Sequence, residues 1–167
     1  MRSISSTGLM ALAATLLSLG SACAQPATPA APTQNAVSFM AQNALAEGVQ
    51  SLPSGVQYKI VKSGPVAGKH PTPDDMVKVN YEGTLTNGQV FDSSFRTNKP
   101  VVFKLGNLIP GWVDALPLMR AGDEWMLYIP PARGYGAQQS GPIPPNSVLI
   151  FRLQLLAVGD DAGPASE

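Results

Sequence analysis

One short stretch, Asn107–Trp112, constrains the fold of this chain more than any other. It joins an apolar run that begins at Val101 to a short amphipathic segment. Pro110, near its centre, favours the first turn of a helix because its φ is fixed and it has no N–H to leave unpaired. The N–H groups of a first helical turn have no partner inside the helix. We therefore predict a helix start with a free amide beside Trp112, an arrangement that can hold one carbonyl group and one apolar ring.

From residue 55 onward, most other segments alternate apolar and polar residues, the period of a strand with one buried face. These segments are Gly55–Ile60 (Val56, Tyr58 and Ile60 sharing one face), Met76–Gly83, Gln89–Phe91, Glu124–Ile129 and Val148–Ala157. Asn87-Gly88 predicts a hairpin between two of them, and Pro117 predicts that the helix is short. The pattern predicts an α+β fold, with an antiparallel sheet of about five strands and one short helix across one of its faces.

The first 24 residues have the composition of an export signal. The apolar run Leu9–Leu19 is too short to span a membrane as a helix, and Ala22-Cys23-Ala24 supplies small residues for cleavage before Gln25. We therefore expect a periplasmic protein. A lipoprotein signal, with Cys23 retained and acylated, is the alternative, although Gly20 stands where that signal needs a bulky aliphatic residue. Cys23 is the only cysteine, so no disulfide within the chain is possible.

The remaining chain divides by composition. Residues 25–35 are rich in Pro, Ala and Thr and predict a flexible linker, and Ala36–Gly48 has helical spacing. We therefore expect a linker and a short helix over residues 25–54, one folded domain over residues 55–158, and a disordered tail over residues 159–167. The single N-terminal helix is shorter than a dimerising helix would normally be, so we expect a monomer.

Several classes of function are disfavoured by what the sequence contains. Its formal net charge is zero and only 13% of its residues are charged, without a basic cluster, which argues against nucleic-acid binding. The one histidine, His70, lies in a loop rich in proline and glycine, without other metal-ligand types grouped around it. No phosphate loop or nucleophile–base pair is evident, so we expect neither a metal nor a cofactor, and no covalent mechanism.

Six short motifs, in order, resemble the FKBP family of peptidyl-prolyl cis/trans isomerases, and most closely its exported bacterial branch, which includes the macrophage infectivity potentiator. The resemblance covers about Gly55 to Val158. The motifs are Tyr81-Glu82-Gly83, Phe91-Asp92-Ser93-Ser94, Leu108-Ile109-Pro110-Gly111-Trp112, Tyr135-Gly136, Ile143-Pro144-Pro145-Asn146 and Leu149-Ile150-Phe151.

The resemblance implies a half-wrapped antiparallel sheet around a short helix, with a pocket for a substrate proline between them. It implies that Trp112 forms the pocket floor and that the Ile109 amide binds a substrate or macrolide carbonyl. Tyr135 would offer a hydroxyl at the rim, and Asp92 a buried polar group beside the reacting bond or a bond to turn amides near Ser94. Further substrate-binding residues implied by the resemblance are Tyr81, Phe91, Phe103, Leu108, Ile143 and Phe151.

The chain departs from the family pattern at the pocket rim. Gly134 stands where the family usually has an alanine, and the loop Gly136–Gly141 is about one residue short. Pro142 occupies a position that is often small or aliphatic. Arg96 lies one place away from the basic residue that some members place against the equivalent of Asp92. These differences bear on substrate preference and macrolide affinity.

The expected function is rotation of X–Pro bonds in unfolded or partly folded exported polypeptides, without a nucleophile. Macrolides of the FK506 and rapamycin type are the expected inhibitors. The alternative is a holdase chaperone, or peptide-binding module, that retains the pocket but has little isomerase activity.

Overall fold

The computed structural model of the chain describes residues 34–97 and 99–164. The predicted export signal, and the predicted linker up to residue 33, lie outside the described residues. None of the described helices is long and apolar enough to cross a membrane.

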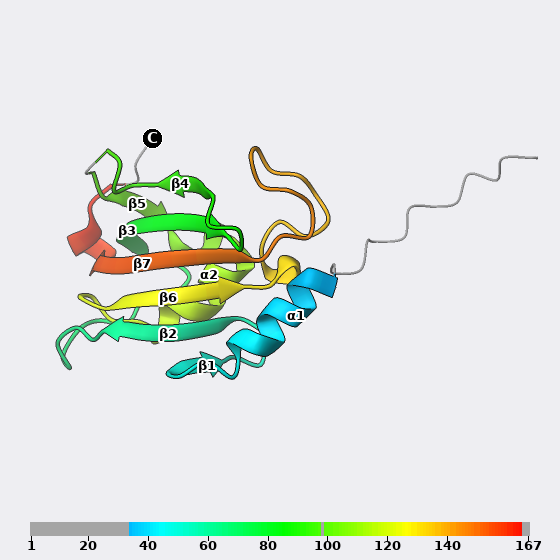
Figure 1. Cartoon of the computed structure of the whole chain (residues 1–167). Helices are drawn as coiled ribbons and strands as arrows, with labels where there is room; N and C mark the ends of the chain where they lie inside the picture. Colours follow the sequence, from blue (N-terminus) through cyan, green and yellow to red (C-terminus); the bar gives the residue numbers. More distant parts are fainter. Residues whose placement is uncertain (1–33, 98, 165–167) are drawn as a thin grey trace, which may run out of the picture.

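Within the described residues, seven strands form one antiparallel sheet in the order β1-β2-β6-β7-β3-β4, and β5 pairs with β3 (Figure 1). The prediction of an α+β fold built on an antiparallel sheet is therefore confirmed, with more strands than the alternation indicated. The strands are β1 (Val49–Ser51), β2 (Gln57–Lys62), β3 (Met76–Leu85), β4 (Val90–Ser93), β5 (Val101–Lys104), β6 (Glu124–Ile129) and β7 (Leu149–Val158).

Strand β3 pairs with three other strands. One of its edges pairs with β7, while the other is divided between β5, which pairs with Met76–Val79, and β4, which pairs with Glu82–Thr84. Tyr81 lies at the division. Its N–H donates to Ser94 Oγ (2.9 Å) and its carbonyl accepts from the Ser94 N–H (2.9 Å). This places Tyr81 beside both β4 and β5.

The predicted hairpin between β3 and β4 is present. The Gly88 N–H donates to the Leu85 carbonyl, and Asn87 Oδ1 accepts from the Gln89 N–H, both at 2.9 Å. Gly88 has a φ of 83°, a conformation that glycine adopts without steric cost.

The central helix α2 (Pro110–Ala115) begins at the predicted proline and ends two residues before Pro117, where the 3-10 helix η2 (Leu116–Leu118) continues the chain. Gly111 permits the close packing of α2 on the sheet, since a Cβ there would lie 2.5 Å from Ile129 Cγ2. The main hydrophobic core lies between these helical turns and the sheet. It includes Trp112, Ala115, Leu116, Met119, Val77, Val79, Trp125, Leu127, Ile129, Leu149, Phe151, Leu153 and Leu155.

The N-terminal helix α1 (Gln34–Asn43) packs against the opposite face of the sheet, over the ends of β2 and β6 (Figure 1). Gln57 Nε2 donates to the Met40 carbonyl and Asn43 Nδ2 donates to Gln57 Oε1, both at 2.8 Å. The Phe39 ring lies 6.4 Å from that of Tyr128. Gln57 is therefore a polar residue that becomes buried because a helix covers it.

Several predicted boundaries and faces are wrong. The helix expected over Ala36–Gly48 ends at Asn43, because the chain must turn there to form β1, which was not predicted. Ile60 was expected on a buried face, but it is 41% exposed near the end of β2. In the tail expected to be disordered, Gly159–Ala162 forms the 3-10 helix η4, and Ala162 is buried because η4 packs on β3 and β7.

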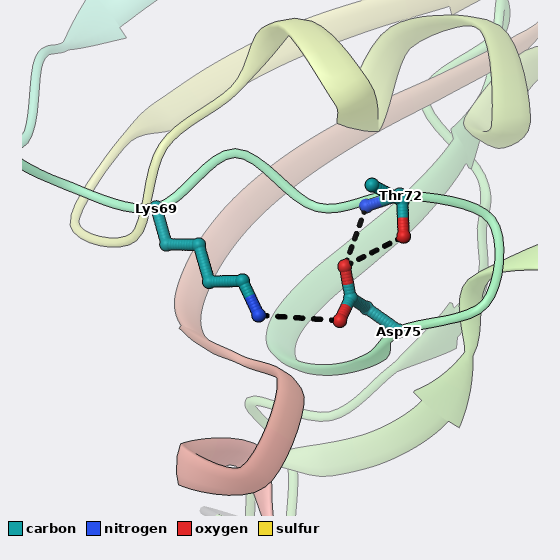
Figure 2. Close-up of polar contacts among 3 residues, drawn as sticks. All are labelled: Lys69, Thr72 and Asp75. Atoms are coloured by element: carbon teal, nitrogen blue, oxygen red, sulfur yellow. Dashed lines mark hydrogen bonds and ion pairs between the residues drawn. The ribbon is translucent and has the colours of Figure 1, made fainter.

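A polar turn before β3 supports the segment that leads into α2. Asp75 accepts hydrogen bonds from the Thr72 N–H and hydroxyl (both 2.8 Å) and pairs with Lys69 Nζ at 3.3 Å (Figure 2). These contacts, led by the bond from the Thr72 N–H, lower the pKa of the Asp75 carboxyl below its ordinary value. The 3-10 helix η1 (Leu105–Asn107) then docks on this turn, because the Leu105 N–H donates to the Asp75 carbonyl at 3.1 Å.

Candidate active site

A cavity of about 330 Å³ opens between α2 and the sheet. It is lined from several elements: β3, β4, β5, β7, the stretch that joins η1 to α2, and the loop after β6. Nearly all of the predicted site residues meet there. The lining residues are Tyr81, Phe91, Asp92, Phe103, Asn107, Leu108, Ile109, Trp112, Tyr135 and Phe151.

Trp112 lies at the centre of the aromatic residues that line the cavity, and it is only 4% exposed. The rings of Tyr81 and Phe151 stand nearly perpendicular to its indole, at 82° and 85°, with ring centroids 5.4 and 5.2 Å away. The Phe103 ring stands at 79°, 6.4 Å away. Edge-to-face contacts of this kind are favourable for aromatic quadrupoles. They produce a box of apolar walls over a flat floor, a shape suited to a small apolar ring.

The wall of the cavity formed by Phe91 and Phe151 depends on Gly83. Phe91 and Phe151 meet edge to face at 88°, with their centroids 5.5 Å apart. A Cβ at Gly83 would lie 2.5 Å from Phe91 Cε2 and 2.8 Å from Phe151 Cε1. Only a glycine therefore leaves these two rings in place.

Ile109 supplies the free amide that the sequence predicted. It is the residue before the first turn of α2, and its carbonyl accepts from the N–H groups of Trp112 (2.9 Å) and Val113 (3.2 Å). Within the part of the chain that the structure describes, the N–H of Ile109 donates no hydrogen bond. A donor at the edge of an apolar cavity can bind a carbonyl oxygen of a ligand.

Asp92 is placed differently from the expectation. It was expected to be buried, but its side chain is exposed at the cavity mouth, because β4 lies on the edge of the sheet. Among the described residues it also accepts no bond from the turn amides, and the Ser94 N–H donates to the Tyr81 carbonyl instead. Asp92 Oδ2 accepts from the Tyr81 hydroxyl at 2.6 Å. Burial, reinforced by this bond and by the charge of Asp92, raises the pKa of Tyr81 above its ordinary value, so Tyr81 remains a neutral donor.

Three further residues differ in where they lie relative to the cavity. Tyr135, at the mouth, is 40% exposed, which leaves it accessible to a ligand. Ile143, expected among the binding residues, is instead 4% exposed in the hydrophobic core and does not line the cavity. Asn107 lines the cavity but was not predicted, although its place directly before Leu108 in the opening stretch could have indicated it.

The structure shows the contacts around two of the positions at which the chain departs from the family pattern. A Cβ at Gly134 would lie 2.9 Å from Leu149 Cδ1, so alanine would require Leu149 to move. Arg96 is exposed and forms no ion pair with Asp92. The loop histidine His70 is exposed, as expected. Within residues 34–97 and 99–164, no group of acidic, histidine or cysteine side chains could hold a metal ion.

The chain is similar to known proteins over most of this fold. Residues 67–156 match the family described as FKBP-type peptidyl-prolyl cis-trans isomerase, and residues 19–60 match the domain amino terminal to FKBP-type peptidyl-prolyl isomerase. The peptidyl-prolyl cis-trans isomerase Mip of Coxiella burnetii is 45% identical over 121 residues, which are 72% of this chain and 52% of that protein. The chain spans about half the length of the curated relatives it matches.

Solved structures agree with these matches. The crystal structure of FkpA from Escherichia coli superposes with a TM-score of 0.71 at 37% identity, covering 75% of this chain and 58% of that one. A peptidyl-prolyl cis-trans isomerase from Pseudomonas syringae superposes with a TM-score of 0.70 at 36% identity, covering 78% of this chain and 98% of that one. By motif, fold and sequence match, the chain belongs to the FKBP family of peptidyl-prolyl cis/trans isomerases.

Proposed function

We propose that this protein accelerates cis/trans rotation of X–Pro bonds in unfolded or partly folded exported polypeptides. The observation that carries the proposal is the aromatic cavity floored by Trp112, with the N–H of Ile109, which donates to no described residue, at its edge. The substrate proline ring would lie on the indole between Tyr81 and Phe151. A substrate carbonyl next to the proline would accept from Ile109.

The reaction needs no nucleophile. The barrier to rotation about a peptide bond is about 18–20 kcal/mol and arises from amide resonance. Uncatalysed X–Pro isomerisation takes tens to hundreds of seconds, slow enough to limit folding. In the twisted transition state the amide has lost resonance and its carbonyl is less polar. An apolar cavity favours this state over the planar amide, which water solvates better, and preferential binding of the transition state is catalysis.

Several of the lining residues have a proposed role in this scheme. Ile109 holds the substrate carbonyl while the preceding amide turns, and the exposed Tyr135 hydroxyl bonds the substrate at the rim. Asp92 orients the Tyr81 hydroxyl and places a carboxylate beside the reacting bond. The apolar walls exclude water. Every 1.4 kcal/mol or so of preference for the twisted state raises the rate about tenfold.

The setting of this activity is also a proposal. The apolar run and small residues before Gln25 support export to the periplasm, and one relative, from Legionella longbeachae, is named an outer membrane protein. Anchoring through an acylated Cys23 is the alternative. We propose a monomer that needs no cofactor, does not bind nucleic acid, and is inhibited by macrolides of the FK506 and rapamycin type.

A protease-coupled assay on an Ala-Leu-Pro-Phe peptide tests the activity. We expect catalysis that is lost when a macrolide is added and reduced in Tyr135→Phe and Asp92→Ala. If the peptide isomerises only at the background rate while the protein still suppresses aggregation of an unfolded client, the isomerase proposal is wrong and the holdase alternative holds.

A further inference from the structure

An ion pair outside the cavity joins the segment that supplies its floor to the segment that supplies its rim. Asp114 lies on α2, two residues after Trp112. Arg133 ends the 3-10 helix η3 (Pro131–Arg133), two residues before Tyr135. Arg133 Nε lies 3.5 Å from Asp114 Oδ2. Of the four ion pairs between described residues, this is the one that joins the loop after β6 to α2.

Neither member of this pair lines the cavity. Asp114 projects from the side of α2 away from Trp112, because two residues turn an α-helix by about 200°. Asp114 and Arg133 instead face a separate cleft, whose other lining residues are Leu52, Pro53, Ser54 and Leu118. Any effect of the pair on the reaction must therefore pass through residues that the pair holds in place.

Asp114 depends on Arg133 for a partner. The Asp114 side chain as a whole is 26% exposed, but its Oδ2 is buried and accepts no hydrogen bond from the described residues. The Arg133 guanidinium is then the group that offsets the cost of burying this charged oxygen. Because water screens a buried atom poorly, the attraction between the two groups is stronger than in an exposed pair. The pair is therefore able to fix the end of η3 on α2.

Tyr135 follows Arg133 in a short closed turn. The N–H groups of Gly134 and Gly136 both donate to the Pro131 carbonyl, at 3.0 and 2.9 Å. Tyr135 lies between these two glycines, so the position of its backbone follows that of η3. Its side chain is 40% exposed and gains little restraint from packing. The place of its hydroxyl at the cavity mouth therefore depends on how firmly η3 is held.

We propose that Arg133, through its ion pair with Asp114, is a positioning residue that holds the Tyr135 hydroxyl where it meets the substrate. This inference rests on the proposed isomerase function. Loss of one hydrogen bond to the substrate lowers kcat/KM by roughly 2- to 12-fold, which is the loss expected for Tyr135→Phe. Because Arg133 acts only through Tyr135, Arg133→Leu should lower kcat/KM measurably, but by no more than Tyr135→Phe does.

The first test is a double-mutant cycle in the protease-coupled assay on Ala-Leu-Pro-Phe. Arg133→Leu is introduced into the unmodified protein and into Tyr135→Phe. We expect it to lower kcat/KM in the first and to have no effect in the second, because without the hydroxyl nothing is left to position. The matched control is Arg120→Leu. Arg120 precedes β6, at the end of the strand opposite η3, so its substitution should leave kcat/KM unchanged.

The second test separates positioning from stability. Arg133→Leu leaves the buried oxygen of Asp114 unpaired and should lower the urea midpoint, whereas the double variant Arg133→Leu with Asp114→Asn removes the charge and should recover the midpoint. The ion pair is absent from both variants, so kcat/KM should stay low in both. The amides of Gly134 and Gly136 should exchange with solvent faster in both variants than in the unmodified protein.

The outcomes distinguish this role from the function itself. Unchanged kcat/KM in Arg133→Leu, or an equal loss in the Tyr135→Phe background, would overturn the positioning role while the isomerase function stands. Recovery of kcat/KM together with the urea midpoint in the double variant would show that the pair is only structural, and this comparison holds even if Arg133→Leu alone does not fold. If the unmodified protein does not accelerate isomerisation of the peptide, the isomerase function is refuted and the positioning role falls with it.

Discussion

Replacing Ile109 by proline should remove the proposed carbonyl-binding amide with little change to the fold. Ile109 has a φ of −58° and a ψ of 147°, which proline adopts without strain, and its N–H makes no bond that would be lost within the described structure. Leu108, which would then precede a proline, is already extended, with a φ of −84° and a ψ of 171°. The substitution therefore changes a ligand contact rather than the helix.

The substitution should affect stability and activity differently. Relative to Ile109→Ala, which also loses the packing of the isoleucine side chain on the core, the stability of Ile109→Pro should stay constant or rise by about 0.4–1 kcal/mol, because proline restricts the unfolded chain. A substrate carbonyl left unpaired in the cavity costs about 1–3 kcal/mol, which lowers kcat/KM by roughly 5- to 150-fold. The matched control is Ile109→Ala, which shortens the side chain and keeps the amide. The comparison of interest is proline against alanine.

The assay is the protease-coupled measurement of kcat/KM on Ala-Leu-Pro-Phe, together with urea denaturation of each variant. Equal activity of Ile109→Pro and Ile109→Ala would show that the amide does not bind substrate. A large loss of stability in Ile109→Pro would instead contradict the claim that proline fits this position.

Three other predictions concern the surroundings of the cavity. Gly83→Ala places a methyl group against the rings of Phe91 and Phe151, so it should destabilise the fold by about 1–3 kcal/mol in urea denaturation and lower kcat/KM, and the double variant with Phe91→Leu should recover part of the stability. Asp123→Ala removes a 3% exposed carboxylate that accepts from two backbone N–H groups, so the urea midpoint should fall by an amount equivalent to about 2–5 kcal/mol. Because its folded-state pKa is lowered, Asp75 stabilises the fold above pH 3.8 and loses this contribution as the pH falls through the folded pKa. The difference in stability between the unmodified protein and Asp75→Asn should therefore be present at pH 7 and shrink in acid. A difference that stays constant with pH would contradict this assignment.

The parts of the fold that the sequence predicted are those set by local rules. Pro110 begins α2, Pro117 lies just past its end, and Asn87-Gly88 forms a hairpin, because each depends on the conformation of one or two residues. The floor and walls of the cavity came from motif resemblance, since no periodicity places Phe103 beside Trp112.

The parts that could not be predicted depend on what covers a surface. Gln57 reads as an outward polar residue, yet α1 buries it, while Ile60 reads as an inward apolar residue, yet it lies where the core ends. β1 has three residues, too few for a period to be recognised. The same reason explains Asp92 and Ile143. Their local sequence does not show that Asp92 lies on an edge strand, or that Ile143 packs into the hydrophobic core from a loop.

The division of one edge of β3 between β4 and β5 has a consequence for the dynamics of the protein. Because β3 is paired along both edges, its amides should be among the slowest to exchange with solvent, opening only with the whole domain. Tyr81 and its ring contacts belong to that same unit. The aromatic cavity would then be as rigid as the core itself, and a ligand that fills it should slow exchange in β3 and β7 as much as it raises global stability.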